Sequence, residues 1–503
     1  MEVHREGSRL GAPSSAPSAF GGAWVFLVAF SLRLLFVIYD GGLGYQPKAD
    51  SLDFHLIALS LVGGTGYSRL SWDLSWQPTA YRMPLTPVFL AAVYKAVGVR
   101  PFVARIAFAA IGAGAAVLVY LACKQLFGRK QGKAIGSLAG VLFAIDPFMI
   151  TNQTLILLEP LHVFLVCAAI WATASYAASR SAAVLWLMSA IAGLLALARP
   201  DGFAYGIAMA LAVALLPASP EAARSVKRRY LRTASEVGNG EPTDAETTVE
   251  PGRSTAQIPT DALEPVARIS LLSDPRVKNA AIVMVGILLA LLPWSFRNYL
   301  VFHRFIPLST ASGDLLLGAN NRATYSFGPF HGYWAYGALI TGEAGSYGFA
   351  GELQADSKRR SLALKHIRDH PLEAVAVIPF RIARGWELYD PLGNARFGET
   401  WGRPLWATYA ALALYYPGFA LALYGGWLLR KYWRKMALLY ALPIYLTVLF
   451  AVATGEPRYR AGVQPVIWVF CSVALYELAR KKIQSLGSLQ ASSDAVTTLG
   501  SGS

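Results

Sequence analysis

Long apolar runs alternate with short polar breaks along most of the chain. A helix of about 20 apolar residues crosses the hydrocarbon core of a bilayer. Runs of this kind recur from residue 22 to residue 479 and predict an all-α polytopic membrane protein with about ten transmembrane helices. A shorter apolar segment, 84–98, begins with Pro84 and Pro87 and predicts a partly inserted helix. The ten predicted spans are 22–39, 103–123, 134–150, 155–178, 182–198, 203–217, 277–296, 403–429, 436–453 and 461–479.

The composition agrees with this pattern. Hydrophobic residues make up 55% of the 503 residues and charged residues only 15%, against about a quarter charged in soluble domains. The net charge of +15 comes mainly from clusters between apolar runs, which favours a role in membrane topology over nucleic-acid binding. The three cysteines lie in apolar surroundings without CxxC or His-Cys spacing, which argues against a disulfide framework or a cysteine metal site.

Basic clusters set the predicted orientation. If the ten spans simply alternate, three clusters and the first residues of the chain fall on one side, which the positive-inside rule makes the cytoplasm. The first span lacks a clear cleavage site and is interpreted as a retained anchor. The clusters are 124–133, 430–435 and 480–482.

The polar stretches divide the chain. Residues 1–21 are predicted to be a disordered cytoplasmic head, and 22–217 a transmembrane module with an outer loop at 40–102. Residues 218–276 combine a basic run with an acidic, Thr/Pro-rich stretch, which predicts a disordered cytoplasmic linker. After a span at 277–296, residues 297–402 are rich in Gly and aromatics, predicting a mixed extracytoplasmic region with an amphipathic helix near 352–368. The C-terminal helices, 403–480, precede a cytoplasmic tail at 481–503.

Ionisable residues near membrane depth are functional candidates because burying them is costly. With the predicted topology they gather at the outer ends of the spans. Spacing i,i+3 in KADSLDF puts two carboxylates on one face of a short helix. Carboxylates surrounded by arginines suit a base that acts beside a bound phosphate or other anion. The candidates are Asp50, Asp53, Arg82, Glu159, Arg199, Arg297, Arg458 and Arg460.

The ordered set of motifs resembles the bacterial GT-C glycosyltransferases of the protein O-mannosyltransferase and aminoarabinose–lipid A transferase superfamily. Asp50, Phe54, Ala58 and the turn 63–67 are similar to the first outer loop of that family, with Phe54 replacing a more usual Tyr. RMPLTPVFL resembles its (K/R)xPLYP segment, with Thr86 at the usual Tyr position. Three further segments also match the family pattern: LLEPL, PWSFRNY with PLSTASGDLLLGANN, and the late RYR. The likeness covers about residues 22 to 480, without the linker.

This resemblance implies a GT-C-like fold and a role for each candidate. Asp50 would be the general base, with its pKa raised by partial burial, and Asp53 is the alternative base because the register leaves the choice open. Glu159 would orient Asp50, the acceptor or an arginine. Arg82 and Arg199, and more weakly Arg297, would bind the phosphate of a polyprenyl carrier. Two roles stay open for Arg458 and Arg460: substrate binding and simple contact with lipid headgroups.

The implied activity is transfer of a hexosyl or pentosyl group, with inversion, from a polyprenyl-phosphate donor to an acceptor protein, lipid or glycan. The site would face the periplasm or exterior of a bacterial inner membrane, where nucleotide sugars are not expected. The absence of a DxD motif and of a Gly-rich phosphate loop agrees with a lipid-carried donor. No cofactor is required by this scheme, no metal-ligand spacing is seen, and a divalent-metal requirement stays open.

Two other function classes remain open. A transporter or flippase of a lipid-linked or anionic substrate also concentrates arginines and acids, although near the bilayer midplane and often in repeated halves. No repeat is detected here. A non-enzymatic assembly subunit, in which 297–402 docks a partner, predicts that Asp50 is dispensable.

Overall fold

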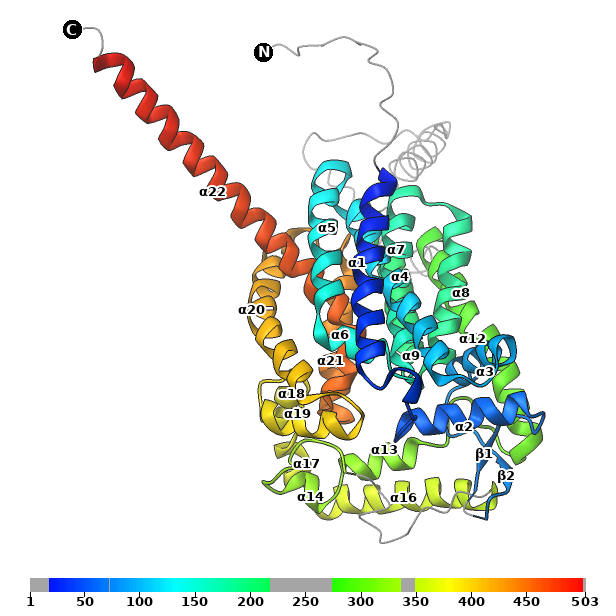
Figure 1. The fold of residues 1–503 in the computed structure, drawn as a ribbon. Coiled ribbons are helices and arrows are strands. Elements are labelled where there is room, and N and C mark those ends of the chain that lie inside the picture. Colours follow the sequence, from blue (N-terminus) through cyan, green and yellow to red (C-terminus); the bar gives the residue numbers. More distant parts are fainter. Residues whose placement is uncertain (1–17, 72, 218–273, 336–348, 501–503) are drawn as a thin grey trace, which may run out of the picture.

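A computed structural model describes residues 18–71, 73–217, 274–335 and 349–500. The fold is a bundle of long helices with a second layer of short helices across one end (Figure 1). This confirms the predicted all-α membrane fold. The bundle comprises α1 (Ser18–Tyr39), α4 (Pro101–Phe127), α5 (Arg129–Ile145), α7 (Glu159–Ser179), α8 (Ala182–Ala198), α9 (Gly202–Leu215), α12 (Pro275–Phe302), α20 (Leu405–Leu429), α21 (Ala437–Val452) and α22 (Gln464–Gly500).

Small residues allow the bundle helices to pack closely. A side chain at Gly193 of α8 would lie 2.5 Å from the carbonyl oxygen of Gly286 in α12, and one at Gly136 of α5 would lie 2.7 Å from the carbonyl of Tyr120 in α4. Because lipid offers no hydrophobic drive between helices, such close backbone contact is a main source of helix association in membranes. Five described helices are long and apolar enough to cross a bilayer: those at 21–39, 101–127, 159–179, 275–302 and 405–432.

The second layer carries the predicted outer-loop elements. The helix expected to present Asp50 and Asp53 is α2 (Asp50–Val62), the short apolar helix is α3 (Leu85–Val97), and the amphipathic one is α16 (Phe349–Asp369). A two-stranded antiparallel sheet pairs Ser68 with Pro78. The remaining elements are β1 (Ser68–Leu70), β2 (Trp76–Pro78), α13 (Ser312–Ala319), α14 (Arg322–Tyr325), α17 (Pro371–Ala376), α18 (Ile378–Gly385), α19 (Pro391–Thr400), and 3-10 turns η1 (Gly42–Gly44), η3 (Arg430–Tyr432) and η4 (Pro457–Gly462).

Several boundaries differ from the prediction for local reasons. The span expected at 134–150 ends at Ile145, because the Asp146 side chain caps a separate short helix, α6 (Pro147–Asn152), that begins with proline. The span expected at 155–178 begins only at Glu159. Helix α22 starts after η4 and continues to Gly500, through most of the predicted tail. The linker residues 218–273 and most of the head, 1–17, lie outside the described residues.

Candidate functional site

A cavity of about 610 Å³ is lined by residues of both the bundle and the second layer. Its wall contains five of the eight predicted site residues, drawn from distant parts of the chain. This agrees with the expectation that the charged residues at span ends gather at one face. The five are Asp50, Asp53, Arg82, Arg199 and Arg458.

Helix α2 presents the two carboxylates. Both lie in its first turn, while Phe54, Ile57 and Ala58 are buried against the neighbouring structure. The i,i+3 spacing therefore places both acids on one face, as predicted. Ala49, just before the helix and on the cavity wall, has φ of +47°, a conformation that is uncommon for a residue with a side chain. The backbone thus bends sharply where it delivers Asp50 to the cavity.

Arg82 joins the two carboxylates. Its Nη2 donates to Oδ1 of Asp50 and, over 2.7 Å, to Oδ2 of Asp53. Asp53 also accepts a 2.6 Å bond from Arg69, a residue that the sequence analysis did not single out. The Arg82 guanidinium lies 5.3 Å from the ring centre of Phe54. Arg82 is thus fixed at the carboxylates from the loop after β2.

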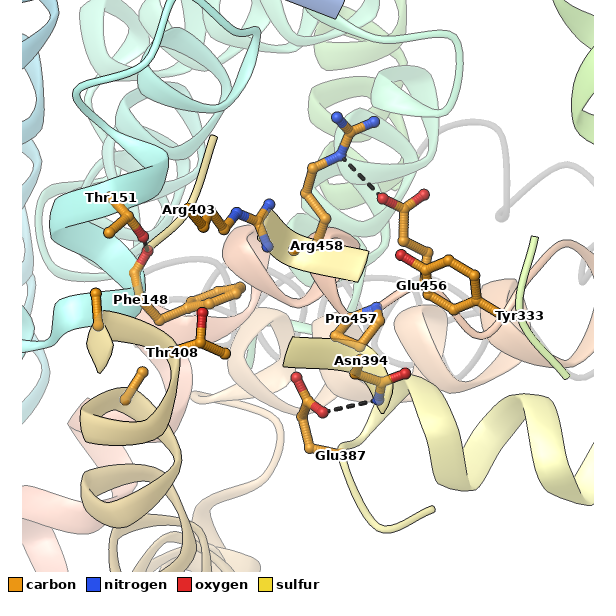
Figure 2. Close-up of a pocket in the computed structure, with 13 residues that line it drawn as sticks. Phe148, Thr151, Tyr333, Glu387, Asn394, Arg403, Thr408, Glu456, Pro457 and Arg458 are labelled. Carbon is orange, nitrogen blue, oxygen red and sulfur yellow. Dashed lines mark hydrogen bonds and ion pairs between the residues drawn. The ribbon is translucent and has the colours of Figure 1, made fainter. Parts of the chain in front are cut away.

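Arg458 gathers three carboxylates at the other side of Asp50. Its Nη1 donates to Asp50 Oδ2 over 2.8 Å, and its Nε lies 3.3 Å from Glu159 and 3.4 Å from Glu456. Figure 2 shows the ion pair with Glu456. Burial alone would lower the pKa of Arg458, but the three acids raise it well above its ordinary value. This arginine is therefore a permanent cation.

The expectation that burial raises the pKa of Asp50 is wrong. Burial does act in that direction, but the adjacent guanidinium groups of Arg82 and Arg458 outweigh it and lower the pKa to about 2. An opposite charge within hydrogen-bonding distance favours the ionised carboxyl group more strongly than partial burial opposes it. Asp50 is consequently held as a carboxylate, with both oxygens engaged by arginine.

Glu159 is fully buried and does not line the cavity. Neither of its carboxylate oxygens accepts a hydrogen bond within the described structure, and it forms an ion pair with Arg458. This arrangement fits the predicted orienting role, exerted on an arginine. A buried carboxylate with so few partners depends on that cation.

Arg199 lies across the cavity, at the end of α8. Its Nε donates to Asp201 over 2.8 Å, and its guanidinium lies 4.6 Å from the ring centre of Tyr459. Burial would lower the pKa of Arg199, but Asp201 and nearby groups raise it. It is a second fixed cation on the bundle side.

Arg297 and Arg460 are placed differently. Arg297 donates 2.7 Å bonds to the backbone carbonyls of Tyr67 and Thr79, which tie α12 to the small sheet. Arg460 donates to Gln464 over 2.7 Å and lies 3.8 Å from the ring centre of Tyr415, inside the bundle. Neither residue lines the cavity. Their surroundings favour structural roles over substrate contact.

A second cavity, of about 20 Å³, lies behind Arg458 between η4, α6, α19 and α20 (Figure 2). Arg403 reaches it and donates a 2.8 Å bond to Asn152. Its volume is about that of one water probe. It therefore extends the charged cluster but has no room for a substrate. Within the described residues, no group of three or more His, Cys, Asp or Glu side chains is placed to hold a metal ion.

Sequence reasoning missed several residues of the site: Arg69, Glu456, Arg403 and the aromatic residues of 397–401. Glu456 stands two positions before Arg458 in GEPRYR, so its charge was a signal available in the sequence. The aromatic content of 325–350 is compatible with a sugar platform or with a folded loop, and a folded loop is the preferred interpretation because loop aromatics more often pack than bind. Phe397 and Trp401 carried no comparable signal in the sequence.

Comparison with known proteins supports the resemblance. Residues 78–237 match the family model described as dolichyl-phosphate-mannose-protein mannosyltransferase. The predicted family likeness is confirmed over this segment. The matched residues include Arg82, Glu159 and Arg199, whereas Asp50 and Arg458 lie outside it. A search of curated proteins gives no match.

Solved structures show more distant likenesses. An oligosaccharyltransferase of Archaeoglobus fulgidus, in complex with Zn and sulfate, is 14% identical with a TM-score of 0.46, over 92% of this chain and 49% of that one. The AglB structure from the same organism, with an inhibitory peptide and a dolichol-phosphate, is 14% identical with a TM-score of 0.44, over 94% and 51%. ArnT from Cupriavidus metallidurans, bound to undecaprenyl phosphate, is 12% identical with a TM-score of 0.36, over 91% and 78%. This chain spans about half the length of the archaeal enzyme.

Proposed function

We propose that this protein is an inverting glycosyltransferase that moves a sugar from a polyprenyl-phosphate carrier to an acceptor hydroxyl. The observation that carries the proposal is the position of Asp50 between Arg82 and Arg458 in the large cavity. A carboxylate and two fixed cations at one point suit a base beside a departing phosphate. The family match at 78–237 supports the class of reaction. The site faces the outside of a bacterial inner membrane, on the side opposite the basic clusters.

The cavity walls supply a place for each part of the donor. Leu449 and Ala453 of the α21 end and Ala198 of the α8 end provide an apolar wall continuous with the bundle, which suits the first isoprenoid units. The carrier phosphate is bound by Arg82 and Arg199, with Arg458 as a third cation. Arginine holds phosphate through paired hydrogen bonds.

Carrier binding frees the base. Both Asp50 oxygens accept hydrogen bonds from arginine. A phosphate oxyanion competes for the same guanidinium groups and releases at least one carboxylate oxygen. That oxygen then takes the proton of the acceptor hydroxyl as the hydroxyl oxygen bonds to the anomeric carbon. The bond from that carbon to the phosphate oxygen breaks, the electron pair leaves with the polyprenyl phosphate, and the anomeric configuration inverts.

Labelled donors test this proposal. Purified protein in lipid receives undecaprenyl-phosphate conjugates of mannose, glucose and aminoarabinose together with a crude envelope fraction. Label leaving the carrier is followed for wild type, Asp50→Asn and Asp53→Asn, with and without EDTA, after thermal unfolding shows that the variants are folded. Transfer that depends on Asp50 supports the proposal. Carrier binding without transfer by wild type would contradict it and favour a transporter.

A further inference from the structure

One part of the wall of the large cavity is aromatic. It is built from the segment after α14 and from the end of α19, and the spans contribute none of its rings. Phe397 and Tyr333 stack with ring centres 4.6 Å apart and planes 15° apart, and Phe330 lies 5.1 Å from Phe397. This aromatic wall consists of Phe330, Tyr333, Trp334, Phe397 and Trp401.

A buried cation holds this wall from behind. The guanidinium of Arg384, in α18, lies 5.0 Å from the ring centre of Tyr333 and 5.9 Å from that of Phe397. Arg384 is fully buried and donates to the His331 carbonyl over 2.6 Å, to Asn394 over 2.7 Å and to Asp390 over 2.7 Å. These bonds connect the segment after α14 to α19. The rings are thus pre-positioned, which lowers the entropy cost of binding a ligand on them.

The aromatic wall begins beside the phosphate-binding cations. The Arg458 guanidinium lies 4.9 Å from the ring centre of Trp401, and Tyr333 stands beside Glu456, the ion-pair partner of Arg458 (Figure 2). A group bonded directly to a phosphate at Arg458 therefore reaches these rings first. In the proposed function the isoprenoid chain leaves the phosphate toward the apolar residues Ala198, Leu449 and Ala453.

The wall has the chemistry of a saccharide site. A pyranose ring has a C–H face that packs on an aromatic face and a rim of hydroxyls that needs polar partners. Thr400, Ser309 and Ser312 line the same cavity and supply hydroxyl groups. An isoprenoid chain carries no polar group that could bond to these hydroxyls.

We propose that the aromatic wall is the subsite for the sugar that is transferred, with Phe397 and Trp401 as its stacking residues. This proposal rests on the proposed function and adds the residues that select the sugar. Recognition comes from ring stacking and rim hydrogen bonds, so it is separate from recognition of the carrier phosphate.

Binding measurements separate recognition of the sugar from recognition of the carrier phosphate. The affinity of protein in nanodiscs is measured for undecaprenyl phosphate and for its mannose, glucose and aminoarabinose conjugates, in wild type, Phe397→Leu and Trp401→Leu. Leucine keeps an apolar side chain but removes the stacking face. We expect at least one conjugate to bind wild type about tenfold more tightly than undecaprenyl phosphate. Both variants should lose that preference, with the affinity for undecaprenyl phosphate changed less than about twofold.

A matched control is Phe327→Leu, three residues from Phe330. Phe327 is 80% exposed and does not line the cavity, so the preference should persist. Equal weakening of conjugate and bare carrier by Phe397→Leu would overturn the subsite, as would a wild type that never prefers a conjugate. A wild type that does not bind undecaprenyl phosphate at all would instead contradict the proposed function, and the subsite with it.

Discussion

Arg458 donates a 2.8 Å hydrogen bond to Asp50, although 408 residues separate the two in the chain. The bond connects the 3-10 turn before the last helix to the first turn of the first outer helix. The candidate site is therefore complete only when the two ends of the chain have come together.

Replacing Asp50 with Asn should abolish transfer. The amide cannot accept a proton from the acceptor hydroxyl, and loss of a positioned base lowers rates by about 10²–10⁴-fold. Steady-state transfer of label measures the effect. Asp53→Asn neutralises the other carboxylate that Arg82 bonds. This variant should retain most of the transfer rate. A stronger loss from Asp53→Asn than from Asp50→Asn would reverse the assignment of the base.

The pH dependence should change when Arg458 is removed. In wild type the arginines lower the pKa of Asp50 to about 2, so the base is ionised throughout an ordinary assay range and its ion pairs are lost only as pH falls from about 4 toward 2. In Arg458→Ala one of the two cations that lower the pKa of Asp50 is gone, while burial still raises it. The pKa of Asp50 therefore rises. The acidic limb of kcat/KM should move upward by about one pH unit or more. An unchanged limb would mean that Asp50 is not the titrating base.

Arg458→Ala should also destabilise the protein. Three carboxylates lose a shared cation, and breaking a buried ion pair costs about 3–5 kcal/mol. Thermal unfolding in detergent measures this loss. Adding Glu159→Gln removes a buried charge that has become unpaired, so the double variant should be more stable than Arg458→Ala alone. Strict additivity of the two changes would argue against their coupling.

Arg297→Lys should lower stability without a selective loss of carrier affinity. Arg297 bonds to the carbonyls of Tyr67 and Thr79 and does not line the cavity. Lysine cannot reproduce both bonds in the same geometry. Undecaprenyl phosphate affinity, measured below the unfolding temperature, should change less than about twofold, whereas Arg82→Lys should reduce it about tenfold. A comparable loss of undecaprenyl phosphate affinity in Arg297→Lys would mean that Arg297 binds the phosphate.

Asp146 should position Arg458 from a distance. Its Oδ2 accepts bonds from Gln464 and Trp468 over 2.7 and 2.9 Å, and Gln464 in turn accepts from Arg460 in the same turn as Arg458. Asp146→Ala should raise the KM for the donor several-fold, because η4 loses this anchor. Asp146→Asn keeps one acceptor oxygen and should recover most of the affinity. Lowered thermal stability with an unchanged KM would indicate a purely structural role.

The sequence by itself determined the helical membrane fold, the short helix with Asp50 and Asp53, and the gathering of charges at one end of the spans. These features follow from local rules: apolar run length, the i,i+3 spacing of α2, and the cost of charge in a bilayer. The sequence also carried the family likeness around Arg82 and Glu159.

Only the tertiary structure decided which charges are partners. The sequence predicted a raised pKa for Asp50 because burial can be inferred locally, whereas the contact with Arg458 depends on the packing of the last helices against the first. The same reason separates Arg458, on the cavity wall, from Arg460, two residues away in the bundle. A 3-10 turn directs neighbouring side chains to different sides, and long-range packing determines which side is the cavity.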